Sequence, residues 1–236
     1  MRRLLYISCF ACFILSCSKG YRIKGTSDLS SLEGKMIMLM TATDDQWHVL
    51  DSCEVVHGGF RMHGMVDSTV IATLFLDGQP VMPLILEPGK IDVVISNIML
   101  KVEGSPLNDS LYGFIAEKYK LDLRAVELER IEPQMIMNGY RQDEIEAYVD
   151  SMYASLGTDM RNLVLGFIKR NYDNVLSLCG FSMLCNGLPR PMLTPLMQEV
   201  VDDAPSVFLE HPSIDKYLHM ARENTERYGV ASVLGE

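Results

Sequence analysis

Three cysteines in the body of the chain, Cys53, Cys179 and Cys185, are the residues best suited to covalent or redox chemistry. A thiol-disulfide enzyme usually carries Cys-x-x-Cys, and in this chain the pattern occurs only at Cys9 and Cys12, within the N-terminal apolar run, and not among Cys53, Cys179 and Cys185. Cys179 and Cys185 are six residues apart, so a continuous helix would separate their Cα atoms by about 9 Å, further than a disulfide can span. A bridge would require the helix to break at Gly180. The favoured interpretation is three unpaired thiols that pack as small hydrophobic side chains, and the alternative is a degenerate thiol-disulfide protein.

A fourth cysteine, Cys17, points to a different reaction. Arg2 and Arg3 precede an apolar run over residues 4–15, which is shorter than the roughly 18 residues that a membrane-spanning helix needs. Residues 1–16 are therefore predicted to be a secretory signal peptide, cleaved between Ser16 and Cys17. The segment Ile-Leu-Ser-Cys at 14–17 resembles the bacterial lipobox, which predicts a lipid on Cys17. Acyl chains there would anchor the protein to a membrane.

The overall charge limits the partners that the protein can bind. The formal net charge is −10, and removal of the signal segment would make it more negative. Nucleic acid and anionic lipid headgroups both need clustered Lys and Arg, so neither is expected as a partner. The residues after Cys17 lack an acidic run of the kind that resembling lipoproteins use for surface export. We therefore expect a location on the outer membrane, facing the periplasm.

The hydrophobic pattern divides the chain into a β half, residues 17–104, and a helical half, residues 105–236. Eight short apolar or alternating runs, separated by turn residues, predict strands at 21–25, 36–40, 48–56, 60–66, 70–76, 81–86, 91–96 and 100–103. The period then changes to that of helices, which are expected from residue 105 onward and at 141–169, 174–185, 194–201 and 213–228. The predicted fold class is α+β, with an N-terminal antiparallel β-sandwich or open barrel of seven to eight strands followed by an all-helical region.

A two-residue turn at Gly58-Gly59 is predicted to join the strands at 48–56 and 60–66 as a hairpin. The register of that hairpin would pair Val56 with Arg61, Val55 with Met62, Glu54 with His63, and Cys53 with Gly64. Asp51 would lie on the face that carries Cys53 and Val55, and its carboxylate would then need backbone amides as partners.

Other chemistry finds little support in the sequence. There is no nucleophile elbow, phosphate loop, dinucleotide fingerprint or zincin motif, so no catalytic residue, metal or cofactor is expected, and the protein is predicted not to be an enzyme. His63 facing Glu54 is too small a set for a metal site. Met36, Met38 and Met40 alternate along one strand; we interpret them as adaptable core residues, and a thioether copper site is the alternative.

Several short segments together resemble a known family. They are YRIKG at 21–25, DS at 51–52 followed by GFRMHG at 59–64, LEPG at 86–89, and GSPLN at 104–108. In this order they resemble domain of unknown function 4369, over roughly residues 20–125. That domain occurs in Gram-negative envelope lipoproteins, usually ahead of a thioredoxin-like domain of the ResA/TlpA type. The chain ends at Glu236, about where such a redox domain would begin, and the resemblance implies no catalytic residues.

These observations lead to one expected function and two alternatives. We expect a lipid-anchored protein that binds or scaffolds an envelope partner, in contact with thiol-redox proteins. The alternatives are the degenerate thiol protein and a carrier of a small apolar ligand between sheet and helices. We expect the helices to pack mainly on one another and to leave a groove near residues 104–106. The two halves would then fold separately.

Overall fold

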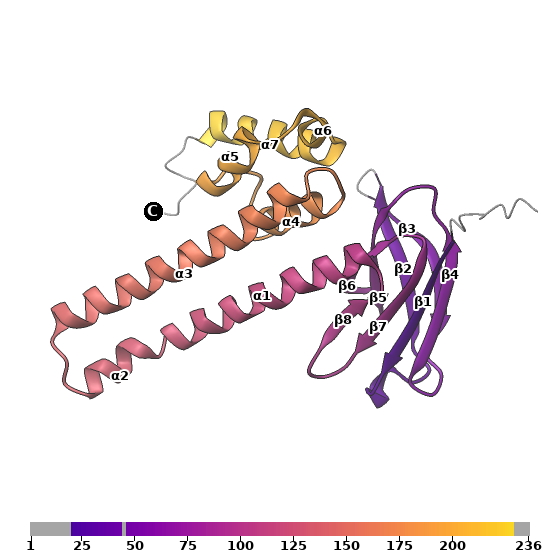
Figure 1. Ribbon diagram of the computed structural model, residues 1–236, viewed down its shortest axis with the longest axis horizontal. Helices are drawn as coiled ribbons and strands as arrows, with labels where there is room; N and C mark the ends of the chain where they lie inside the picture. The colour runs from indigo at the N-terminus through magenta and orange to yellow at the C-terminus, as the bar shows by residue number, and fades with distance from the viewer. Residues whose placement is uncertain (1–19, 44–45, 229–236) are drawn as a thin grey trace, which may run out of the picture.

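Two four-stranded sheets pack face to face in the N-terminal half (Figure 1). The computed structural model describes residues 20–43 and 46–228. The first sheet has the order β4 (Gly59–Met65), β1 (Gly20–Ser27), β7 (Gly89–Ile95) and β8 (Leu100–Glu103). The second has the order β3 (Gln46–Glu54), β2 (Met36–Thr43), β5 (Val70–Leu76) and β6 (Gln79–Leu86), and a 3-10 turn, η1 (Ser30–Leu32), precedes β2. The predicted α+β class with an eight-stranded β half is confirmed, although β1 and β7 are parallel neighbours.

The predicted hairpin between the third and fourth strands is wrong. β3 pairs with β2 and β4 pairs with β1, so the two strands belong to opposite sheets. The tight turn is formed by His57 and Gly58, both at positive φ, and only Val56 and Gly59 bridge across it. The side-chain pairs predicted from a hairpin register, including Glu54 with His63, therefore do not form.

Two glycines explain why β4 joins β1. Gly25 lies opposite Phe60, and Gly64 lies opposite Tyr21, in the β1–β4 register. A Cβ on Gly25 would lie 2.0 Å from the Phe60 ring, and one on Gly64 would lie 2.7 Å from Cζ of Tyr21. Each aromatic ring thus fills the space above a glycine of the neighbouring strand, which fixes the register of the pair.

The C-terminal half is helical, as predicted. Its helices are α1 (Pro106–Leu128), α2 (Ile131–Met137), α3 (Gln142–Arg170), α4 (Leu176–Cys185), α5 (Pro195–Asp202), α6 (Ser206–Leu209) and α7 (Pro212–Tyr228). The short helices α2 and α6 were not expected from the sequence. Pro106 and Pro195 occupy first-turn positions of their helices, where a missing amide costs nothing.

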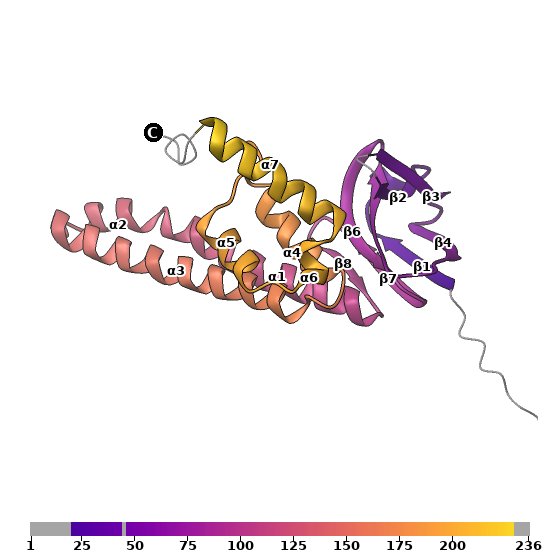
Figure 2. The ribbon, with the colours of Figure 1, turned by 90° about the horizontal axis from the view of Figure 1, so that it is seen from above.

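Helices α1 and α3 run antiparallel and form a long arm with α2 at its tip (Figures 1 and 2). Phe114 of α1 stacks on Phe167 of α3 with ring centroids 4.0 Å apart. Helices α4 and α5 pack on α3, and α6 and α7 contact α4, where the rings of Phe208 and Tyr217 meet Phe181. Both views show the tip of the arm extending beyond these helices. None of the helices in the described residues is long and apolar enough to cross a membrane.

The first turns of α1 complete the β half. Asn108 is fully buried; its Oδ1 accepts from the Ile85 amide at 2.8 Å, and its Nδ2 donates to the Ile85 carbonyl at 2.7 Å. The Asn108 side chain thus makes the two hydrogen bonds to the free edge of β6 that a neighbouring strand would make. Nδ2 also donates to the Ser105 hydroxyl.

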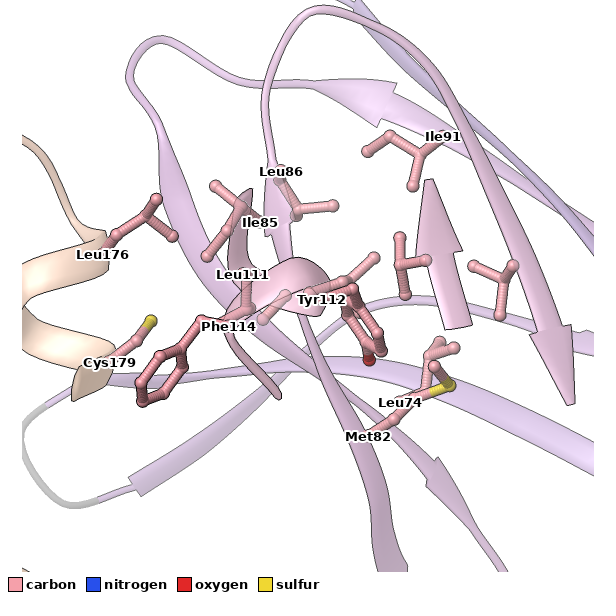
Figure 3. Close-up of a cluster of buried hydrophobic side chains, with 14 of the residues drawn as sticks. Leu74, Met82, Ile85, Leu86, Ile91, Leu111, Tyr112, Phe114, Leu176 and Cys179 are labelled. Atoms are coloured by element: carbon pink, nitrogen blue, oxygen red, sulfur yellow. The ribbon is translucent and has the colours of Figure 1, made fainter. Parts of the chain in front are cut away.

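One hydrophobic core runs from the sheets into the helices. Figure 3 shows Leu111 and Phe114 of α1 close to Ile85 on one side and to Leu176 and Cys179 of α4 on the other. Helix α1 therefore belongs to the core of both halves, and the boundary near residue 104 is crossed by continuous packing.

Candidate functional site

The predicted lipidation site lies outside the described residues. Ser16 and Cys17 precede Gly20, where β1 begins. In sequence, therefore, only two residues separate Cys17 from the first strand of the sandwich.

The three cysteines among the described residues do not form a redox centre. Cys53 lies on β3, whereas Cys179 and Cys185 lie on α4, and all three are unpaired. Helix α4 is continuous through Gly180, so the helical geometry holds Cys179 and Cys185 apart.

Burial keeps these thiols protonated. It raises the pKa of Cys179 to about 12 and that of Cys185, which is hydrogen-bonded to the Tyr217 hydroxyl, to about 11. Burial also raises the pKa of Cys53. Since the thiolate is the reactive form, none of the three has the environment of a nucleophile.

Side chains of β3 close the gap between the free edges of β3 and β4. Asp51 Oδ2 accepts from the His63 amide at 3.1 Å, and the thiol of Cys53 accepts from the Arg61 amide. Asp51 Oδ1 also accepts from the Ser52 amide at 2.8 Å. The prediction that Asp51 needs backbone amides is confirmed, and its role is to join the two sheets.

A second carboxylate holds the turn that leads into β4. Glu33 accepts from the amides of His57 at 2.8 Å and Gly58 at 3.1 Å. These bonds lower the pKa of Glu33. Among the described residues there is no group of three or more His, Cys, Asp or Glu side chains that could hold a metal ion.

The interpretation of Met36, Met38 and Met40 as core residues is wrong. Ile37 and Leu39, which alternate with them, are buried between the sheets, so the methionines point to the outer side of the second sheet. Met36 is 50% exposed, and the other two are half-buried.

Two residues of β3 lie on the same outer surface. Val49 is opposite Met40, and Trp47 is opposite Ala42. The Trp47 ring reaches the ring of Phe75 on β5, with centroids 4.8 Å apart and planes at 70°. We call Met36, Met38, Met40, Trp47 and Val49 the methionine face. These five side chains are apolar, and both Trp47 and Val49 are about half exposed; Glu54 and Ser52, opposite Met36 and Met38, border them on the same side of the sheet.

A hollow of about 780 Å³ adjoins the methionine face. Its wall is formed by Ala42 and Thr43 at the end of β2 and by residues at the start of α7, which include Pro212, Tyr217 and Met220. Figure 2 shows α7 approaching the end of the second sheet at this point. A smaller hollow of about 390 Å³ lies beside Cys53 and Phe60.

The groove expected near residues 104–106 is filled. Ser105 is buried against Asn108, and the Gly104 amide donates to Asp109 Oδ1 at 3.0 Å.

The sequence failed to predict the methionine face, because a strand that is apolar on both sides does not reveal which side is the core.

Residues 21–111 match the family model of a domain of unknown function, DUF4369. The chain carries a DUF4369 domain. The matched region contains β1 to β8 and the first turns of α1, so the DUF4369 domain includes Asn108 and Leu111, which complete the edge and core of the sandwich. No curated protein matches the chain.

Proposed function

We propose that this protein is a lipid-anchored, non-enzymatic binding module of the cell envelope, held on the outer membrane and facing the periplasm. The lipobox-like segment ending at Cys17 supports the anchor. The observation that carries the binding role is the methionine face, an apolar surface on the outer side of a sheet whose own core is already complete. Unbranched thioether side chains adapt to different partner shapes, and exposed apolar patches mark interaction sites.

The partner in this proposal is another envelope protein, with thiol-redox proteins as the first candidates because of the family resemblance. β3 is an edge strand, and its part before Asp51 is not bonded to β4, so a partner segment can contact both that stretch of backbone and the methionine face. The separated, protonated cysteines argue against the degenerate thiol protein.

The anchor is tested by mass spectrometry of the protein isolated from membranes. We expect acyl chains on Cys17 as the new N-terminus, and release of the Cys17→Ala variant from the membrane fraction. Unmodified Cys17 in the processed protein would refute the anchor.

The binding role is tested by affinity purification from detergent-solubilised envelope. Trp47→Glu and Met40→Glu should each lose the captured partner, whereas Val207→Glu, the same kind of change at an exposed apolar residue of α6, should retain it. Equal capture by all three variants would refute the role of the methionine face.

A carrier of a small apolar ligand is the second candidate, and the hollow beside α7 is the observation that favours it. Trp47 is the only tryptophan of the chain and lies opposite Ala42, which lines the hollow. A saturable change in Trp47 fluorescence on titration with a long-chain fatty acid, absent in Met220→Glu, would support the carrier. An unchanged spectrum would exclude it.

A further inference from the structure

An uncovered row of apolar side chains runs along α1 in the outer part of the arm. Tyr119, Leu123 and Val126 are 61%, 45% and 48% exposed. Their spacing continues the helix face on which Asn108 and Tyr112 contact β6. The same face is thus covered by the second sheet at the start of α1 and is left open further along.

This row does not take part in the contact with α3. The residues of α1 that face α3 include Phe114, which stacks on Phe167, and Leu128, which is buried. An α-helix turns by about 100° per residue, so Tyr119, Leu123 and Val126 lie on another side of the helix. Figure 1 shows α3 on one side of α1 and no helix on the opposite side of the outer arm.

Two basic and two acidic residues beside the row are placed symmetrically about its centre. Lys120 and Glu127 flank one side, and both are exposed. If two copies of α1 lay antiparallel with a two-fold axis next to Leu123, Lys120 of each copy would face Glu127 of the other. Lys118 and Glu129 would be matched in the same way on the other flank. Both basic residues already contact acids of their own helix, Glu117 and Asp122, so the pairing extends existing charge networks.

We propose that the arm is a self-association surface, on which a second copy of this chain binds by antiparallel packing of the Tyr119–Leu123–Val126 row. A two-fold axis makes each contact occur twice, so one apolar row and one set of charges suffice for a closed dimer. The proposal does not depend on the lipid anchor or on the methionine face.

The lengths of the segments fit this arrangement. From Leu123 back to Pro106, where α1 meets the sheets, the helix rises about 26 Å; from Leu123 to Met137 at the arm tip, the chain extends at most about 21 Å. The tip of the partner's arm would therefore reach the sandwich without passing into it.

The antiparallel packing would bring the tip of one arm close to the turn between β7 and β8 of the other copy, and both places carry exposed apolar side chains. Ile136 and Met137 are exposed at the tip of the arm. Ile98 and Met99 are exposed in the turn between β7 and β8, which Figure 1 shows on the side of α1 opposite α3. In the dimer each tip would approach the other copy's turn, which provides a partner for both groups.

Sedimentation velocity of the chain from Ser18 to Glu236, over a concentration series, tests the proposal. The wild type should form a dimer, and Leu123→Asp should be monomeric with an unchanged circular dichroism spectrum. Val207→Asp, which makes the same kind of change away from the arm, should still dimerise. A monomeric wild type at all concentrations, or dimers that persist in Leu123→Asp, would overturn the proposal.

Two further tests decide the case if Leu123→Asp does not fold. Lys120→Glu should weaken the dimer by about tenfold or more, because two attractive pairs become repulsive, and Lys120→Glu with Glu127→Lys should restore it. Leu123→Cys should give a disulfide-linked dimer on mild oxidation, whereas Val207→Cys should not. Absence of both the charge rescue and the selective cross-link would contradict antiparallel packing.

Discussion

Replacement of Asn108 by Ala tests how α1 and the β-sandwich are joined. The variant would leave the amide and carbonyl of Ile85 without their partners at a fully buried position. Each buried polar group without a hydrogen bond costs about 1–3 kcal/mol, so the loss of both partners in Asn108→Ala should lower the free energy of unfolding by about 2–6 kcal/mol. For a chain of this size, at about 3 °C per kcal/mol, that corresponds to a fall in Tm of about 6–18 °C.

Urea unfolding followed by circular dichroism measures this effect. Asn162→Ala is the matched control, since Asn162 is exposed on α3 and alanine has the higher helix propensity; it should be neutral or slightly stabilising. Hydrogen exchange should also show the Ile85 amide opening faster in Asn108→Ala. A loss of less than about 1 kcal/mol, or an unchanged exchange rate at Ile85, would show that water or local rearrangement replaces the side chain, and the reasoning would fail.

Three further predictions concern single sites. Gly25→Ala should cost about 1–3 kcal/mol in thermal unfolding because its Cβ meets the overlying ring, whereas Gly113→Ala, with open space around it, should not destabilise. Glu33→Gln should be less stable than wild type at neutral pH. Because folding lowers the pKa of Glu33 from its ordinary 4.5, the difference in stability should vanish as acid protonates the native carboxylate. A difference in stability that persists in acid would contradict this reasoning. Ellman's reagent at pH 8 should react much more slowly with Cys179 and Cys185 in the native protein than in urea; equally rapid native reaction would contradict the burial of Cys179 and the partial burial of Cys185.

The sequence predicted the elements of this fold better than their partners. All eight strands were located, because alternating apolar residues and turn residues act over a few positions. The partner of β4 was missed because it depends on how Phe60 fills the space above Gly25, two residues far apart in sequence. Gly25 and Gly64 inside predicted strands were the available signal, since a glycine there often marks a close approach of another group.

The candidate site was harder to predict from the sequence than the strands and helices were. On β2 the methionines and the residues between them are all apolar, so hydrophobicity alone did not separate Ile37 and Leu39, which are buried, from the exposed methionine face. Asn108 was also missed, because an asparagine in the first turn of a helix is ordinarily solvated or a cap. Its contact with Ile85 arises only when the edge of β6 meets α1.

Site-specific photocross-linking from the methionine face tests the central proposal most directly. A photoreactive amino acid at position 47 of the full-length chain, expressed in its native envelope, should cross-link to one defined envelope protein after irradiation. The same group at position 207 should give no such product, and neither should position 47 in the Cys17→Ala background, where the chain is not anchored. A protein that cross-links equally from both positions, or no product from position 47 in the anchored chain, would contradict a membrane-anchored module that binds its partner through the methionine face.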